Sequence, residues 1–230
     1  MRGILFITII LILGSSCNKV EDIPPFIPPI QDSNDTDTSG NHVDTTSAYK
    51  HIVDQQTLIA HPGLTNSKKY ITYLIKKGNN YCEGNNFVLS KYQSLQFKAI
   101  LDSSCIYQTV LPSNQEDINK LYGFSDCTSH HHTNSARFGW NWDKGALRIH
   151  AYCYADSIRS YREMGIVKVN EEFDCQLTVL PHQYIFSLNG DTVMMDRGCT
   201  DNIASGYLLY PYFGGDEPAP QDISVQIKEY

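Results

Sequence analysis

Beyond residue 65, apolar and polar side chains alternate with a period of two in most of the apolar segments. This alternation is typical of β-strands that bury one face and expose the other. Residues that favour tight turns separate the segments, and helical periodicity is nearly absent. The pattern therefore predicts an all-β domain built from two packed antiparallel sheets or a barrel. The expected strands are Tyr70–Ile75, Ser94–Leu101, Ser135–Trp142, Leu147–Tyr154, Ile166–Val169, Phe173–Val179, Gln183–Leu188, Thr192–Met195, Gly206–Phe213 and Ile223–Lys228.

Two short segments carry sharper local signals. Asn189 and Gly190 lie between two apolar runs, and this pair favours a two-residue hairpin turn because both central positions need a positive φ. In the segment 113–123, Ser113 can cap a first helical turn, Glu116 completes a capping box, and Gly123 can end the helix. This segment predicts one short helix across an end of the sheets.

The segment 135–154 predicts a second hairpin, with its turn at residues 143–145. If Trp142 lies opposite Leu147, all residues on one face are apolar, and Gly139 lies opposite His150 with open space beside the imidazole. The other face then carries Arg137, Asn141, Arg148, His150 and Tyr152. These side chains could hold a sugar or a carboxylate. The alternative interpretation is a solvated sheet face of amphipathic residues.

The N-terminal residues carry an export signal. Arg2 precedes an apolar run that is too short to span a bilayer, and small residues follow it directly before Cys17. The stretch resembles the lipobox of bacterial lipoproteins, which implies removal of residues 1–16, acylation of Cys17 and a location in the cell envelope, at the outer membrane. An ordinary signal peptide is the alternative. Residues 17–49 are rich in Pro, Asp, Ser and Thr, so we expect a disordered tether before a β-sandwich domain at 50–230.

Charge and cysteine content limit the possible partners. The net charge of −7 and the lack of a basic run argue against nucleic acid as a partner. The charge also disfavours a polyanionic substrate unless a local basic cleft overcomes the overall field. Six cysteines follow Cys17, and in an oxidising compartment they permit up to three disulfides, with free buried thiols as the alternative.

Three consecutive histidines, His130, His131 and His132, precede the second hairpin. Imidazole suits zinc, copper or nickel. In an extended chain, however, successive residues point to opposite sides, so at most two of the three could share a site without a special turn. We therefore predict no metal and no cofactor, and we place His130 and Asn134 at the rim of the candidate site.

A second aromatic tract, at 206–220, adds Tyr210 and Tyr212 to one expected strand face, ahead of Gly214. With Arg137 and His150, these residues match by type and order the Arg, His and paired Tyr of concanavalin-like jelly rolls. That group includes lectins and alginate-type polysaccharide lyases. The chain departs from the lyase pattern at Arg148, where the lyases carry Gln two residues before the His, and at Pro211, where a Lys is usual. The resemblance implies a jelly-roll sandwich with a glycan site.

Three functions fit these observations. The first is a lipid-anchored envelope protein that binds glycan through a face of Tyr, His and Arg side chains. The second, implied by the resemblance, is a lyase that cleaves uronate polymers by β-elimination. In that case Arg137 or Asn141 neutralises the carboxylate, His150 or a Tyr takes the α proton, and another Tyr protonates the leaving oxygen. The third is a surface lipoprotein that docks another envelope protein.

Overall fold

The computed structural model describes residues 69–230, which form twelve β-strands and two short 3-10 turns. The 3-10 turns are η1 (Ser103–Cys105) and η2 (Pro112–Asn114). The strands are β1 (Ile71–Ile75), β2 (Leu89–Tyr92), β3 (Ser94–Leu101), β4 (Asn119–Ser125), β5 (Ser135–Asp143), β6 (Ala146–Ala155), β7 (Ile158–Val167), β8 (Glu172–Leu180), β9 (Gln183–Leu188), β10 (Asp191–Asp196), β11 (Ala204–Leu209) and β12 (Ile223–Glu229).

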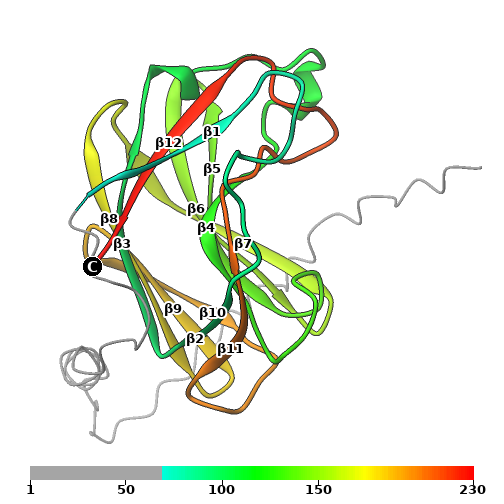
Figure 1. Ribbon diagram of the computed structural model, residues 1–230, viewed down its shortest axis with the longest axis vertical. Helices are drawn as coiled ribbons and strands as arrows, with labels where there is room; N and C mark the ends of the chain where they lie inside the picture. The colour runs from blue at the N-terminus through cyan, green and yellow to red at the C-terminus, as the bar shows by residue number, and fades with distance from the viewer. Residues whose placement is uncertain (1–68) are drawn as a thin grey trace, which may run out of the picture. The chain divides into compact units, whose positions relative to one another are not determined.

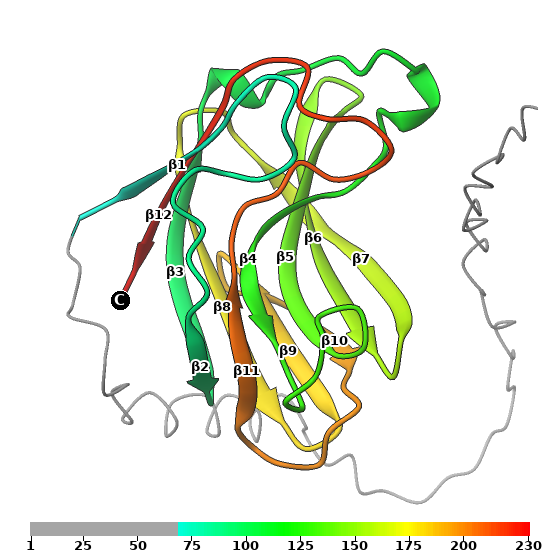
Figure 2. The same cartoon turned by 45° about the vertical axis from the view of Figure 1, so that its right-hand side comes forward.

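The strands form two six-stranded sheets, shown from two directions in Figures 1 and 2. The first sheet has the order β1, β12, β3, β8, β9, β10, and the second has the order β2, β11, β4, β5, β6, β7. Early strands pair with late ones, β1 with β12 and β2 with β11, and these pairs are antiparallel. Such pairing wraps the chain as in a jelly roll. The predicted antiparallel β-sandwich of jelly-roll type is confirmed.

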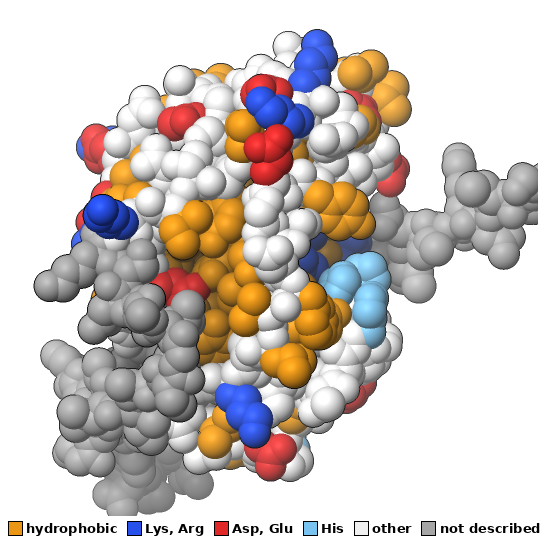
Figure 3. Space-filling view, viewed as in Figure 1, with side chains coloured by type: hydrophobic (Ala, Val, Ile, Leu, Met, Phe, Trp, Pro, Cys, Tyr) orange, Lys and Arg blue, Asp and Glu red, His pale blue; other side chains and the backbone are white. Residues whose placement is uncertain are grey.

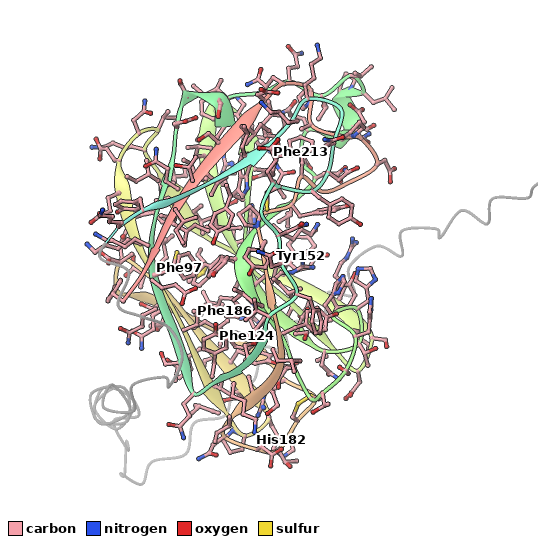
Figure 4. The ribbon with its side chains drawn as sticks, viewed as in Figure 1. Phe97, Phe124, Tyr152, His182, Phe186 and Phe213 are labelled. Atoms are coloured by element: carbon pink, nitrogen blue, oxygen red, sulfur yellow. A yellow bond between two sulfur atoms is a disulfide. The ribbon has the colours of Figure 1, made fainter. Side chains whose placement is uncertain are left out.

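Aromatic side chains from both sheets meet in the core. The ring of Phe138 on β5 lies 5.6 Å from that of Phe97 on β3 and 5.1 Å from that of Phe186 on β9, as centroid distances. Figure 4 labels Phe97 and Phe186 between the two layers. Every second residue of β3 is buried, so the alternation in the sequence marks the face that packs against the opposite sheet.

Both predicted hairpins are confirmed. In the β5–β6 hairpin, Trp142 pairs with Leu147, Gly139 with His150, and the remaining pairs follow the predicted register. In the β9–β10 hairpin, Asn189 and Gly190 have φ angles of 51° and 97°, which the two central positions of this turn require.

The helix predicted at residues 113–123 is wrong. The segment contains η2 and then enters β4, and no α-helix occurs in residues 69–230. A break in the pairing of β4 with β5 lies between Lys120 and Tyr122. Because of this bulge, the consecutive residues Leu121 and Tyr122 are both buried. Two adjacent buried residues break the period of two, which made a strand resemble a helix in the sequence.

The sequence also missed two edge strands. β2 lies at one edge of the second sheet, and β7 lies at the other. Most residues of β7 are exposed or half-buried, so only residues 166–169 had the expected alternation. Charged side chains along an edge discourage pairing with another chain. The strand predicted at 206–213 instead ends at Leu209, two residues before Pro211, which has no N–H to donate.

One disulfide, Cys127–Cys199, joins the loop after β4 to the loop after β10. The other four cysteines in the described residues are buried free thiols: Cys82, Cys105, Cys153 and Cys175. Of the three disulfides that the cysteine count allowed, the described part of the chain therefore contains one.

The predicted signal peptide at 1–16, Cys17 and the predicted tether at 17–49 lie outside the described residues, as do residues 50–68 of the predicted domain. Within residues 69–230, none of the helical segments is long and apolar enough to cross a membrane.

Candidate functional site

The second sheet has a polar face, directed away from the core, and we use this term for the face that carries Lys120, Arg137, Asn141, His150 and Tyr152. Arg137, His150 and Tyr152 are only 6%, 6% and 4% exposed. The alternative of a solvated sheet face does not describe these positions. Buried polar groups normally have partners, so the partners of each residue decide what this face can do.

Within residues 69–230, Arg137 is a buried cation without a carboxylate partner. Its Nε atom donates no hydrogen bond within the described chain, and no ion pair reaches its guanidinium there. The guanidinium lies 5.7 Å from the ring centroid of Tyr152, its cross-strand neighbour. Burial lowers the pKa of Arg137 from its usual value. On β4, Gly123 leaves room for this side chain, because a Cβ atom there would lie 2.9 Å from Arg137 Cγ.

Arg197 is a second buried arginine, and its hydrogen bonds give it a structural role. Its Nε donates a 2.6 Å hydrogen bond to Asp126 Oδ2, and its other nitrogens donate to backbone carbonyls that include Leu180 O and Ile203 O. Tyr184 Oη donates to the same Asp126 oxygen at 2.6 Å. A buried charge with a carboxylate and several hydrogen bonds is compensated. In the described part of the chain, the side chain of Arg137 has none of these partners.

A second cation, Lys120 on β4, lies beside Arg137. Lys120 Nζ lies 4.8 Å from the ring centroid of Tyr152, so both cations border one phenol ring. The Nζ atom donates one described hydrogen bond, to the backbone oxygen of Ile118 at 2.6 Å. Burial, followed by the positive charges of Arg137 and Arg159, lowers the pKa of Lys120 to about 7, although Asp117 opposes the shift.

Tyr212 joins this group, whereas Tyr210 does not. The backbones of Tyr212 and Lys120 exchange hydrogen bonds of 2.8 and 3.0 Å. Tyr210 instead packs at the edge of the core, with its ring centroid 5.7 Å from that of Tyr73 and 6.1 Å from that of Tyr122. The chain therefore directs the two tyrosines to different surroundings, although they are two residues apart.

His150 and Asn141 form a separate pair on the polar face. His150 Nε2 lies 3.1 Å from Asn141 Oδ1, while its Nδ1 is buried and without a hydrogen bond in the described residues. Burial lowers the pKa of His150 to about 4, so the ring is neutral at pH 7. Arg148 is neutralised by Glu163 at 2.9 Å. This end of the polar face therefore offers hydrogen bonds rather than net positive charge.

The predicted rim residues lie at the other end. Asn134 Oδ1 accepts a 3.0 Å hydrogen bond from the backbone N–H of Asp156, which is a structural role in the loops. The ring of His130 lies 4.2 Å from that of His131, and the ring of His131 approaches Tyr207. His130 thus belongs to a histidine cluster beside the polar face, while Asn134 supports the loop that carries this cluster.

Exposed aromatic rings border the polar face. The ring of Tyr81 meets that of Tyr212 at 5.0 Å, and the ring of Phe87 meets that of Tyr207 at 5.2 Å, as centroid distances. Tyr81 and Phe87 are 66% and 75% exposed. Figure 3 shows basic side chains recessed between histidine and hydrophobic side chains on this side of the domain. Exposed aromatic faces beside recessed polar groups are suited to a sugar chain.

Sequence reasoning missed Lys120 and Tyr207. Lys120 lies inside the segment predicted to be helical, and Tyr207 lies in the strand predicted at 206–213, where only Tyr210 and Tyr212 are predicted site residues. One signal in the sequence could have identified Lys120. It is the single Lys of its segment, and apolar and polar residues alternate on each side of the bulge between Lys120 and Tyr122. The pairing of β4 with both β5 and β11 brings these residues to Arg137.

No family model matches the sequence, and no curated protein matches it. Among solved structures, alginate lyase AlyC3 is 13% identical, with a TM-score of 0.48 over 76% of this chain and 79% of that chain. The marine PL7 alginate lyase AlyA1 from Zobellia galactanivorans is 9% identical, with a TM-score of 0.46 over 76% and 84%. A GH16 protein of Bacteroides ovatus is 10% identical, with a TM-score of 0.45 over 73% and 84%. At such low sequence identities and TM-scores, these structures show a likeness of fold alone.

Proposed function

We propose that the polar face binds a glycan that carries carboxylate groups, with a uronate carboxylate held by Arg137 and Lys120. The observation that carries the proposal is the buried guanidinium of Arg137, which has no anion within the described chain. Burying an unpaired charge is costly, and a ligand carboxylate would supply the missing partner. A guanidinium binds a carboxylate through two parallel hydrogen bonds.

The local charge differs in sign from the charge of the whole chain. The chain carries a net charge of −7, but Lys120, Arg137 and Arg159 act on one another at the polar face. This is the local basic region that a polyanionic ligand would need. Two of these cations border the phenol ring of Tyr152. The exposed rings of Tyr81 and Phe87 lie at the border of the polar face, where they can stack on sugar rings.

We also propose that the protein presents this face from a membrane. The support is the sequence alone: the lipobox-like residues before Cys17, followed by a Pro-rich and polar stretch. Acylation of Cys17 and a flexible tether would hold the domain at the cell envelope, at the outer membrane, within reach of polysaccharides.

Binding to a panel of polysaccharides tests the proposed function. The purified protein should bind polymers of uronic acids, and it should bind neutral glucans and galactans at least about 10-fold more weakly, because these lack the carboxylate for the charged hydrogen bonds. Equal binding to neutral polymers would contradict the role of Arg137. If the protein bound none of these polysaccharides and captured one envelope protein from membranes, the docking function would be favoured instead.

Lys120 favours a second candidate function, β-elimination on the same polymers. A lysine with a pKa of about 7 is a partly neutral amine near neutral pH, so it can accept a proton. In such a reaction Arg137 would neutralise the uronate carboxylate, Lys120 would take the α proton, and Tyr152 or Tyr212 would protonate the leaving oxygen. Release of unsaturated uronates from a bound polymer would establish the lyase, and binding without release would leave the glycan-binding function.

Binding of an acidic glycan should depend on pH through Lys120. Free Lys120 has a pKa of about 7, and a bound carboxylate stabilises the ammonium form and raises this pKa. Above pH 7 the ligand must therefore bind together with a proton, so we expect the affinity to fall as the pH rises, by at most about 10-fold per pH unit. The neighbouring groups are Arg137, Arg159, Asp117, His132 and Tyr152.

Lys120→Met should remove this pH dependence between pH 7 and 9, because the other nearby groups keep one charge state in that range. Calorimetric titration with a uronate oligosaccharide in two buffers of different ionisation heat measures the proton uptake directly. If the affinity of Lys120→Met depended on pH as that of the unchanged protein does, the pH dependence would arise from a group other than Lys120.

A further inference from the structure

The three histidines before β5 lie on a tight turn, and this turn gathers their rings on one side. The backbone N–H groups of Thr133 and Asn134 both donate to the carbonyl of His130, at 2.8 and 3.1 Å. This is the special turn without which consecutive histidines would diverge. The ring centroids lie 4.2 Å apart for His130 and His131, 4.4 Å for His131 and His132, and 5.2 Å for His130 and His132.

The nitrogen atoms of the three rings are close enough to share one ion. One ring nitrogen from each histidine lies within 4.8 Å of those from the other two. Around a tetrahedral zinc ion with bonds of about 2.0–2.1 Å the nitrogens lie closer together, so the side chains must rotate to bind one. His130 and His132 are exposed, and His131 is half-buried. An ion can therefore reach the cluster from solvent.

The partner of His131 fixes one nitrogen and leaves the other available. His131 Nδ1 lies 2.8 Å from Tyr207 Oη, which also accepts a 3.1 Å hydrogen bond from the backbone N–H of His131. Histidine ligands of metals commonly use one ring nitrogen for the ion and the other for a partner that orients the ring. Tyr207 can serve as that partner, which leaves Nε2 of His131 available for an ion.

Arg137 limits the choice of ion at the histidine cluster. Its positive charge acts on His131 and His132, so it repels a cation bound there. This repulsion disfavours ions that bind imidazole poorly, because only strong bonds to the ring nitrogens offset it.

We propose that His130, His131 and His132 form a binding site for one Zn²⁺ ion at the edge of the polar face. Three imidazoles and no carboxylate favour zinc or a similar transition metal over Ca²⁺ or Mg²⁺, which prefer oxygen ligands. A zinc ion with three protein ligands keeps a fourth position for water or another ligand. Because the ring of His132 lies 5.2 Å from that of Tyr154 on β6, the site adjoins the polar face. It does not depend on the proposed function.

Calorimetric titration of the purified protein with Zn²⁺ at pH 7 tests the site. We expect one ion per chain, and Tyr207→Phe should weaken binding by about 10-fold or more because His131 loses its orienting partner. His131→Asn and His132→Asn should each weaken it further. Substitution of Co²⁺ should give a visible absorption band from the nitrogen ligands, and this band should be lost in His131→Asn.

His182→Asn is the matched control, since His182 is an exposed histidine in the β8–β9 turn. Figure 4 shows it at the lower end of the view, away from Tyr152. This variant should bind Zn²⁺ as the unchanged protein does. Thermal unfolding shows whether each variant is folded. Absence of binding at 100-fold excess of Zn²⁺ would overturn the proposal, and so would binding that survives in a folded His131→Asn, His132→Asn double variant.

Discussion

Arg137→Met should abolish most of the binding to acidic glycans while leaving the fold intact. Loss of one partner of a buried charged pair across an interface costs about 2–5 kcal/mol of binding free energy, which corresponds to a fall in affinity of roughly 30-fold to 4,000-fold. Calorimetric titration with a uronate oligosaccharide measures this change. The variant should bind neutral polymers, if it binds them at all, as the unchanged protein does.

The stability of the same variant separates a binding residue from a structural one. Within the described chain the side chain of Arg137 makes no hydrogen bond or ion pair, so its replacement by an apolar side chain of similar length removes a buried charge and leaves no described carboxylate unpaired. We expect an equal or higher free energy of unfolding. A clear loss of stability together with the loss of binding would contradict a ligand role and indicate a structural role for Arg137.

Arg197→Met should have the opposite result. This change leaves the Asp126 carboxylate buried without its cation, and removal of one partner of a buried ion pair costs about 3–5 kcal/mol of stability. Tyr184 and the backbone N–H of Ser205 would still donate to Asp126, which keeps the loss from being larger. Chemical denaturation of the two arginine variants side by side measures the difference in their free energies of unfolding.

Binding by Arg197→Met, measured at a temperature where it is folded, should be close to that of the unchanged protein. Arg197 follows β10 and is bonded to loop carbonyls, and it does not belong to the group around Tyr152. If Arg197→Met lost binding as strongly as Arg137→Met, the acidic glycan site would lie at the Asp126 end of the domain instead.

The β5–β6 hairpin could be predicted in detail because the required information is local. Residues 143–145 supply the turn, and the register that this turn sets gathers apolar residues on one face and polar residues on the other. The structure has this register, with Arg137 opposite Tyr152 and Gly139 opposite His150. Four of the candidate residues, Arg137, Asn141, His150 and Tyr152, come from this one hairpin, so the sequence placed them on a common face.

β4 could not be predicted because its bulge hides the strand pattern. Residues on either side of the break between Lys120 and Tyr122 belong to different alternating series. Ser113 and Glu116 also matched a capping box, although they lie in and after the 3-10 turn at Pro112. A bulge adds one residue to one strand, and only the partner strand reveals it.

The composition of the site could not be predicted because it depends on contacts between distant segments. Lys120 reaches Arg137 through the pairing of β4 with β5, and Tyr212 reaches Lys120 through bridges formed after β11 has ended. Tyr210 was expected beside Tyr212, but it packs against Tyr73 and Tyr122. The break at Pro211 ends the strand, so the rule that residues two apart share a face no longer applies.

The central claim is that the uncompensated guanidinium of Arg137 receives a carboxylate from a glycan. The most direct measurement compares the affinity of the purified protein for a uronate oligosaccharide and for the same oligosaccharide with its carboxyl groups reduced to alcohols. The two ligands share ring shape and linkage and differ only in charge. We expect the reduced ligand to bind at least about 30-fold more weakly, as the loss of a buried charged pair implies. Equal affinity for the two ligands would contradict the claim.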